Sequence, residues 1–259
     1  MKNRQVMLTS IVAALATAIV IGLGALLTGT IRTLPGVTAA PVTAPDLARA
    51  HQLAGSAAAI ITLGLAVMAR SLTGWLALIA MALEIALAPF PITHAILAPV
   101  CFSLIYATGV MNSPSWVAGP QPTPSQWGPL RVFADIVPIL VLFQIALGAA
   151  FRHSHIDNPI WHVLNALIVI TIILIPGVFV LRQYPEHPAL KPAALAMVVI
   201  AGIQVLLGFG VYMVLLMSEG NNMGLIVTGI LHVLTGSLTL AASLVFAIAV
   251  NRNLIQSKA

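Results

Sequence analysis

Eight long apolar segments follow one another along this chain of 259 residues, and most of the charged residues lie between them. Each segment is close to the roughly 20 apolar residues that a helix needs to cross the hydrocarbon core of a bilayer. Charged residues make up only 7% of the chain, whereas a soluble domain carries about a quarter, so the surface has to be solvated by lipid. The sequence therefore predicts an all-α membrane protein with eight transmembrane helices, near 6–29, 50–69, 74–90, 93–111, 132–151, 159–181, 192–217 and 224–250.

The basic residues predict the orientation, because cytoplasmic loops carry an excess of Lys and Arg. With both termini in the cytoplasm, only Arg32, Arg49 and Arg152 fall on the outer side. The charge of +5 is spread thinly between apolar segments, which indicates topology and excludes a nucleic-acid surface. We expect a multi-pass protein of the cell (inner) membrane whose main partner is the bilayer. The inner side then holds Lys2, Arg4, Arg70, Arg131, Arg182, Lys191, Arg252 and Lys258.

The longest connection, 112–131, is rich in proline and divides the chain into two blocks of four segments. We predict an N-terminal half at 1–111, a cytoplasmic linker at 112–131 and a C-terminal half at 132–259. Because each half has the same number of segments, the expected architecture is two pseudo-symmetric four-helix bundles.

The odd-numbered segments share a short pattern, which supports an internal repeat. The fifth segment carries QIALG at 144–148 and the seventh QVLLG at 204–208. The third carries EIALA at 84–88, and the first carries the degenerate VIGLG at 20–24.

The even-numbered segments share a second pattern, a histidine followed four positions later by a small residue. Residues at i and i+4 lie on one helix face, so the small residue leaves a recess beside the imidazole that a planar macrocycle would need. Small residues are common wherever membrane helices pack closely, so one match means little, but each even segment has one. The matches are His51 with Gly55, His94 with Ala98, His162 with Ala166, and His232 with Gly236.

These histidines predict haem ligands, because a neutral imidazole is a good axial ligand for iron and cofactors commonly sit at the centre of helix bundles. All four fall in the outer half of the membrane, so His51 is expected to pair with His94, and His162 with His232. The three outer arginines are expected to hold the haem propionates. Snorkelling at helix ends remains the ordinary alternative for each of them.

Two other kinds of site have less support in the sequence. It has no HExxH pair and no cysteine cluster that would suggest zinc. A proton-coupled transporter usually needs carboxylates deep in the membrane, and only Glu84 lies mid-membrane. Glu84 is either such a group or a replacement for the glutamine at the matching repeat position, and we favour the replacement.

The chain resembles the haem A synthase family of cytochrome oxidase assembly factors. The resemblance covers most of the chain and is clearest in FQIALGAAFR at 143–152, HVLNA at 162–166, QVLLG at 204–208, and His232. It implies an oxidoreductase of haem A biosynthesis that oxidises a ring methyl of haem O to a formyl group. It also implies that His51 and His94 flank the substrate haem, and that His162 and His232 ligate a haem b that relays electrons.

The first half departs from the family pattern. A glutamate three residues before the first histidine and an arginine directly after it are usual, but Ala48 and Gln52 stand here. The expected function is a haem A synthase-like enzyme. The alternatives are a non-enzymatic haem-b-binding subunit or assembly factor of a respiratory complex, and a haem-free scaffold. Haem O synthase, respiratory-complex subunits and a second copy of the chain are the expected protein partners.

Overall fold

The computed structural model describes residues 2–31, 45–217 and 223–255, and this part of the chain is almost entirely helical. Seven of its helices are long and apolar enough to cross a membrane. The chain is therefore an all-α, multi-pass membrane protein. The helices are α1 (Lys2–Ile31), α2 (Pro45–Ala69), α3 (Leu72–Ala86), α4 (Pro91–Val110), α5 (Pro114–Val117), α6 (Leu130–Arg152), α7 (Ile160–Gln183), α8 (Leu190–Met217) and α9 (Met223–Asn253), and the two-residue strands are β1 (Thr123–Pro124) and β2 (Leu254–Ile255).

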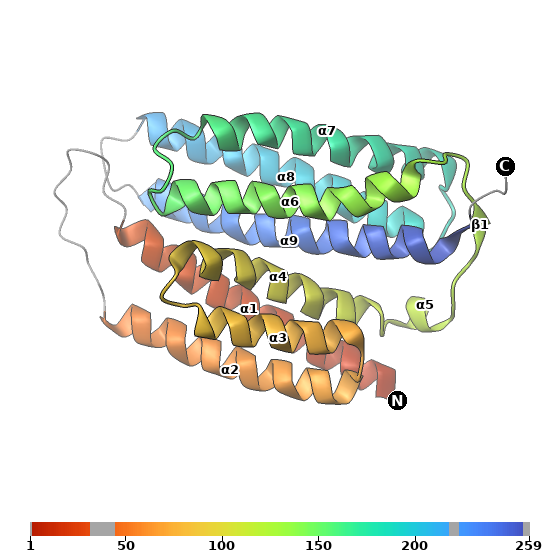
Figure 1. Ribbon diagram of the computed structural model, residues 1–259, viewed down its shortest axis with the longest axis horizontal. Coiled ribbons are helices and arrows are strands. Elements are labelled where there is room, and N and C mark those ends of the chain that lie inside the picture. Colours follow the sequence, from red (N-terminus) through yellow and green to blue (C-terminus); the bar gives the residue numbers. More distant parts are fainter. Residues whose placement is uncertain (1, 32–44, 218–222, 256–259) are drawn as a thin grey trace.

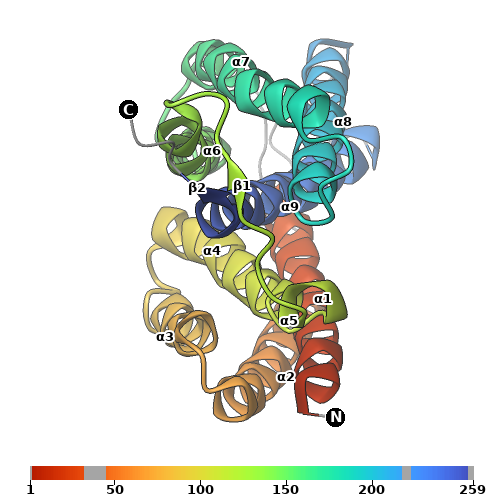
Figure 2. The same cartoon turned by 90° about the vertical axis from the view of Figure 1, so that its right-hand side faces the viewer.

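The long helices form two groups of four that lie side by side (Figures 1 and 2). In the first group α1, α2, α3 and α4 contact one another in a closed ring, and α6, α7, α8 and α9 do the same in the second. Each group has its own buried apolar cluster. The two four-helix groups expected from the sequence are therefore present.

The seam between the groups is formed mainly by α1 and α4 against α9. A third apolar cluster of Ile21, Ala98, Phe102 and Ala241 occupies this seam and joins these three helices. Small residues allow close approach elsewhere too: a Cβ added to Gly109 of α4 would lie 2.9 Å from Ser10 Cβ of α1. This is the usual means by which membrane helices pack.

The third expected span is shorter in the structure than the sequence suggested. Helix α3 has 15 residues, or about 22 Å at 1.5 Å per residue, whereas the expected segment ran to residue 90. A turn at Leu87–Phe90 ends it before Pro91, which opens α4. Seven long spans are thus found, and an eighth crossing by α3 remains a prediction.

The connection between the halves is packed against the inner helix ends. Thr123 and Pro124 pair in parallel with Leu254 and Ile255. Gln121 N donates to Asn253 Oδ1 at 2.9 Å. The segment expected as a linker is therefore hydrogen-bonded to the end of α9 and to the residues that follow it.

The ends of the helices fall into two sets, as the orientation prediction requires. Helix α1 begins and α9 ends at one end of the molecule, where α5 and β1 also lie (Figure 1). Arg70, Arg131, Arg182 and Lys191 lie at or just beyond helix ends on this same side. The opposite end holds Arg49 and Arg152, while Arg32 and Lys258 lie outside the described residues.

Candidate functional site

All four histidines of the repeat lie toward the same end of the molecule. His51, His94 and His162 stand in the first two turns of α2, α4 and α7, and His232 lies deeper in α9. Each of these helices begins at the end opposite the linker (Figure 1). The helices thus bring together, in each group, two histidines that are far apart in the sequence.

The first pair is His51 and His94, whose ring centroids are 5.9 Å apart with the ring planes at 79°. His51 Nδ1 lies 3.1 Å from the backbone oxygen of Val20 in α1. His94 Nδ1 lies 3.0 Å from the backbone oxygen of Glu84 in α3. A carbonyl oxygen only accepts, so Nδ1 carries the hydrogen in both rings, and Nε2 keeps a free lone pair.

The second pair is His162 and His232, with centroids 6.1 Å apart and planes at 75°. Side-chain amides replace the backbone oxygens here. Gln144 Nε2 lies 3.0 Å from His162 Nδ1 and also donates to the backbone oxygen of His162 at 2.9 Å. Asn165 Nδ2 donates to Gln144 Oε1 at 2.7 Å, which holds the amide in place. Gln204 Nε2 lies 3.3 Å from His232 Nε2.

These contacts explain the pattern that the sequence shows in its odd-numbered segments, which are α1, α3, α6 and α8. The four residues that hold the imidazoles, Val20, Glu84, Gln144 and Gln204, occupy the same position in the repeat. The sequence pattern aligned these four residues with each other but did not predict that they contact the histidines. Each of them is followed four positions later by a glycine or alanine, and this shared spacing was the sequence signal of a common role.

The glycines of the same pattern are contact points for the imidazoles. A Cβ added to Gly24, Gly148 or Gly208 would lie 3.0–3.1 Å from Cε1 of His51, His162 or His232. Such an approach is tighter than carbon atoms normally make, so the imidazole packs directly on a helix backbone. The residue at the same position in the third segment is Ala88, which lies beyond the end of α3 and is exposed.

The small residues four positions after each histidine have different surroundings. Space is open around a Cβ added to Gly55, whereas one added to Gly236 would lie 3.2 Å from Gln204 Nε2. Ala98 is buried in the seam and Ala166 is half-buried. The recess expected beside each imidazole is therefore open at Gly55, but Gln204 borders it at Gly236.

The outer arginines are placed differently from one another. Arg152, at the end of α6, crosses the seam: its Nε donates to Thr28 Oγ1 at 2.7 Å, and its Nη2 donates to the backbone oxygen of Ala25. It also interacts electrostatically with His232. Arg49 is exposed in the first turns of α2, and Arg32 lies outside the described residues.

The remaining histidines do not join either pair. His155 is exposed in the loop after α6, where its Nδ1 lies 3.0 Å from the backbone oxygen of His153. His187 is buried at the opposite end, and its Nδ1 accepts from the backbone N–H groups of Ala189 and Leu190. His187 therefore has a structural role at the start of α8.

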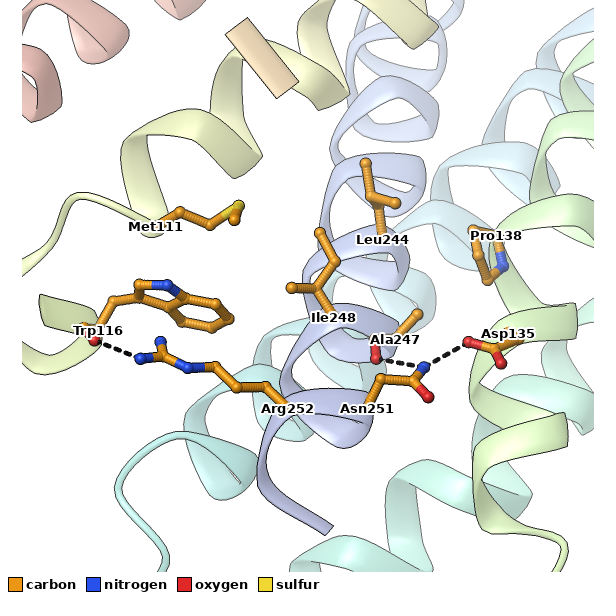
Figure 3. Close-up of a pocket in the computed structure, with 9 residues that line it drawn as sticks. All are labelled: Met111, Trp116, Asp135, Pro138, Leu244, Ala247, Ile248, Asn251 and Arg252. Atoms are coloured by element: carbon orange, nitrogen blue, oxygen red, sulfur yellow. Dashed lines mark hydrogen bonds between the residues drawn. The ribbon is translucent and has the colours of Figure 1, made fainter. Parts of the chain in front are cut away.

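A groove of about 770 Å³ lies at the linker end of the seam, between α4, α6 and α9 (Figure 3). Arg252 stacks over Trp116 on one side, at 3.9 Å from the ring centroid, and Asp135 accepts from Asn251 at 2.6 Å on the other. Ile248, which lines the groove, follows His232 by sixteen residues of α9, or about 24 Å. The groove is therefore separate from both histidine pairs.

Within the described residues, no three His, Cys, Asp or Glu side chains gather as a metal site. What the fold brings together is two imidazoles inside each bundle, an arrangement that can bind one metal ion from two sides. The protein is thus a multi-pass helical membrane protein with one pair of histidines in each four-helix group. No protein-family model matches the chain, and a search of curated proteins gives no significant match.

Proposed function

We propose that this protein is a haem A synthase-like oxidoreductase of the inner membrane, with a haem O-type substrate held by His51 and His94 and a haem b held by His162 and His232. The observation that carries the proposal is the occurrence of two matched histidine pairs with ring centroids 5.9 and 6.1 Å apart. The repeat and the resemblance described from the sequence give the pairs their chemical interpretation.

The spacing of each pair fits a haem iron with two axial imidazoles. With metal–nitrogen bonds of about 2.0–2.1 Å and a ring nitrogen roughly 1.1 Å from its centroid, two opposed imidazoles have centroids about 6.3 Å apart. The observed distances come within a few tenths of an ångström of that value. In the second pair, Gln144 Nε2 and Gln204 Nε2 lie 3.2 and 3.3 Å from the Nε2 atoms of His162 and His232, so both amides would have to turn away for these atoms to ligate iron.

The hydrogen bonds of the first pair also suit ligation. Metal-binding histidines usually donate their second ring N–H to a carbonyl or carboxylate, which fixes the ring orientation and the tautomer. The backbone oxygens of Val20 and Glu84 do this for His51 and His94. Both rings are thus prepared to offer Nε2 to a metal.

Unpaired polar atoms supply an independent argument. Glu84 Oε2, Gln204 Oε1 and His232 Nδ1 are buried without a hydrogen-bond partner, and among the described residues only Arg131 Nε shares this property. Buried polar groups are nearly always paired. Two of these atoms belong to the second pair and one to the residue whose backbone holds His94, which favours sites that receive a further polar ligand.

The histidines, three glycines and Arg152 have different roles in the proposed function. Haems held at these pairs would supply the redox chemistry that the oxidation of a ring methyl to a formyl group requires. The histidines bind and orient, the glycines at 24, 148 and 208 let the imidazoles approach the backbone, and Arg152 offers a cation at the outer end of the seam. Haem O synthase and cytochrome oxidase subunits are the partners that such an activity implies.

A second candidate function is favoured by one observation in α2. The positions that carry a glutamate and an arginine in the resembled family are occupied here by the half-buried Ala48 and the exposed Gln52. A haem-b-binding subunit or assembly factor of a respiratory complex would need neither.

The test is the pigment content of the purified full chain, with and without a co-expressed source of haem O. We expect a Soret band, a b-type pyridine haemochrome, and haem A when haem O is supplied. His162→Ala or His232→Ala should lose the haem b, and His51→Ala or His94→Ala should abolish conversion, with His155→Ala as the unchanged control. Haem b without conversion would establish the second candidate, and a colourless protein would refute both.

A further inference from the structure

Glu84 is a carboxylic acid enclosed within the first bundle. Its side chain is 3% exposed, and its Oε2 has no hydrogen-bond partner. It lies on the face of α3 that carries Ala77, Ala80 and Met81, all buried. An ionisable group buried at membrane depth is costly and is usually retained for function.

The repeat indicates where this carboxyl reaches. Glu84 occupies the position of Gln144 and Gln204, whose amide nitrogens lie 3.0 and 3.3 Å from ring nitrogens of His162 and His232. The backbone oxygen of Glu84 holds His94. In the second bundle the side chain at this position contacts the histidines, whereas in the first bundle the backbone of Glu84 makes the contact and its carboxyl is buried without a partner for Oε2.

The neighbours of the carboxyl show on which side of the pair it lies. It interacts electrostatically with Cys101, which follows His94 by two turns on the same face of α4 and is buried. Ala98, one turn from His94, stands between them on that face. The carboxyl thus lies on the inner side of His94, toward Cys101.

Nothing described in the first bundle neutralises this group. Its cations stand toward helix ends: Lys2, Arg4 and Arg70 at the linker end, and Arg49 exposed in the first turns of α2. A hydroxyl group would satisfy the carboxyl in either protonation state, because it donates to a carboxylate and accepts from a carboxylic acid. An apolar vinyl group would neither donate to a carboxylate nor accept from a carboxylic acid.

We propose that Glu84 hydrogen-bonds a hydroxyl substituent of the macrocycle held between His51 and His94, and so selects a hydroxyl-bearing haem over haem b at the first site. This inference rests on the proposed function. It makes Glu84 a specificity-determining residue of the first site.

The test is a competition between haem O and haem b for the purified full chain, followed by extraction and chromatography of the bound haems. Wild type should retain haem O in preference at one of its two sites. Glu84→Leu should lower the ratio of bound haem O to haem b by about tenfold, which corresponds to one hydrogen bond at the upper end of the ordinary range. Glu84→Gln, which still hydrogen-bonds a hydroxyl, should keep most of the preference.

Glu84→Met supplies a second apolar variant of similar length, and the Soret band of the second site reports whether each variant is folded. An unchanged haem ratio in folded Leu or Met variants would overturn the role of Glu84, as would a wild type that fills its first site with either haem equally. Absence of any haem in wild type would instead refute the proposed function.

Discussion

His162 rests against the backbone of Gly148, so closely that a Cβ at that position would lie 3.0 Å from the ring Cε1. Gly24 and Gly208 bear the same relationship to His51 and His232. In each of α1, α6 and α8, a glycine follows by four positions the residue that holds an imidazole, and the same imidazole packs on that glycine. The internal repeat is therefore found in the contacts of the structure as well as in the sequence.

Gly148→Ala should displace the His162 ring and weaken haem binding at the second site. Overpacking of this kind typically costs about 1–3 kcal/mol. Gly202→Ala in α8 is the matched control, because space around an added Cβ is open there. Soret absorbance per protein, measured for both variants, checks the prediction, and equal haem content in the two would contradict it.

Arg152→Ala should lower thermal stability, because Arg152 joins α6 to Thr28 and the backbone of Ala25 across the seam. Hydrogen bonds from charged groups contribute about 1.5–3 kcal/mol. Arg49→Ala, on the same outer side but exposed, serves as the control. A thermal unfolding scan in detergent should show a lower midpoint for Arg152→Ala only. Similar midpoints for the two variants would show that this contact does not stabilise the protein.

His187→Ala should destabilise the protein without removing haem. His187 accepts from two N–H groups at the start of α8 and contacts the backbone oxygen of Gln121 through Nε2 at 3.0 Å. Loss of such a cap costs about 1 kcal/mol. The expected result is a lower unfolding midpoint with an unchanged Soret band, and loss of the band in folded protein would show that His187 acts at a haem site.

Arg252→Ala should loosen the linker. Arg252 stacks over Trp116 and donates to its backbone oxygen at 2.8 Å, which holds α5 against α9. Limited proteolysis should then cut between residues 112 and 129 faster than in wild type. Arg182→Ala, exposed at the end of α7, should leave the rate unchanged, and a rate unaffected by Arg252→Ala would mean that the strand pairing alone secures the linker.

The apolar segments and their spacing predicted most of the fold, because a chain in lipid must satisfy its backbone hydrogen bonds within helices. The segment expected at 132–151 is Leu130–Arg152 in the structure, and the one at 192–217 is Leu190–Met217. The third segment was wrong in length, since apolar composition continues past the point where the turn before Pro91 ends α3.

By itself, the sequence determined the membrane class, the division into two groups of four helices, and the histidine repeat. Only the tertiary structure decided how close the two rings of each expected pair lie, that the residues at positions 20, 84, 144 and 204 hold them, and that Arg152 crosses the seam. The physical reason is that hydropathy fixes where a helix lies in the chain. The rotation of each helix about its own axis, which aims the imidazoles inward, depends on contacts such as that between Gly148 and His162.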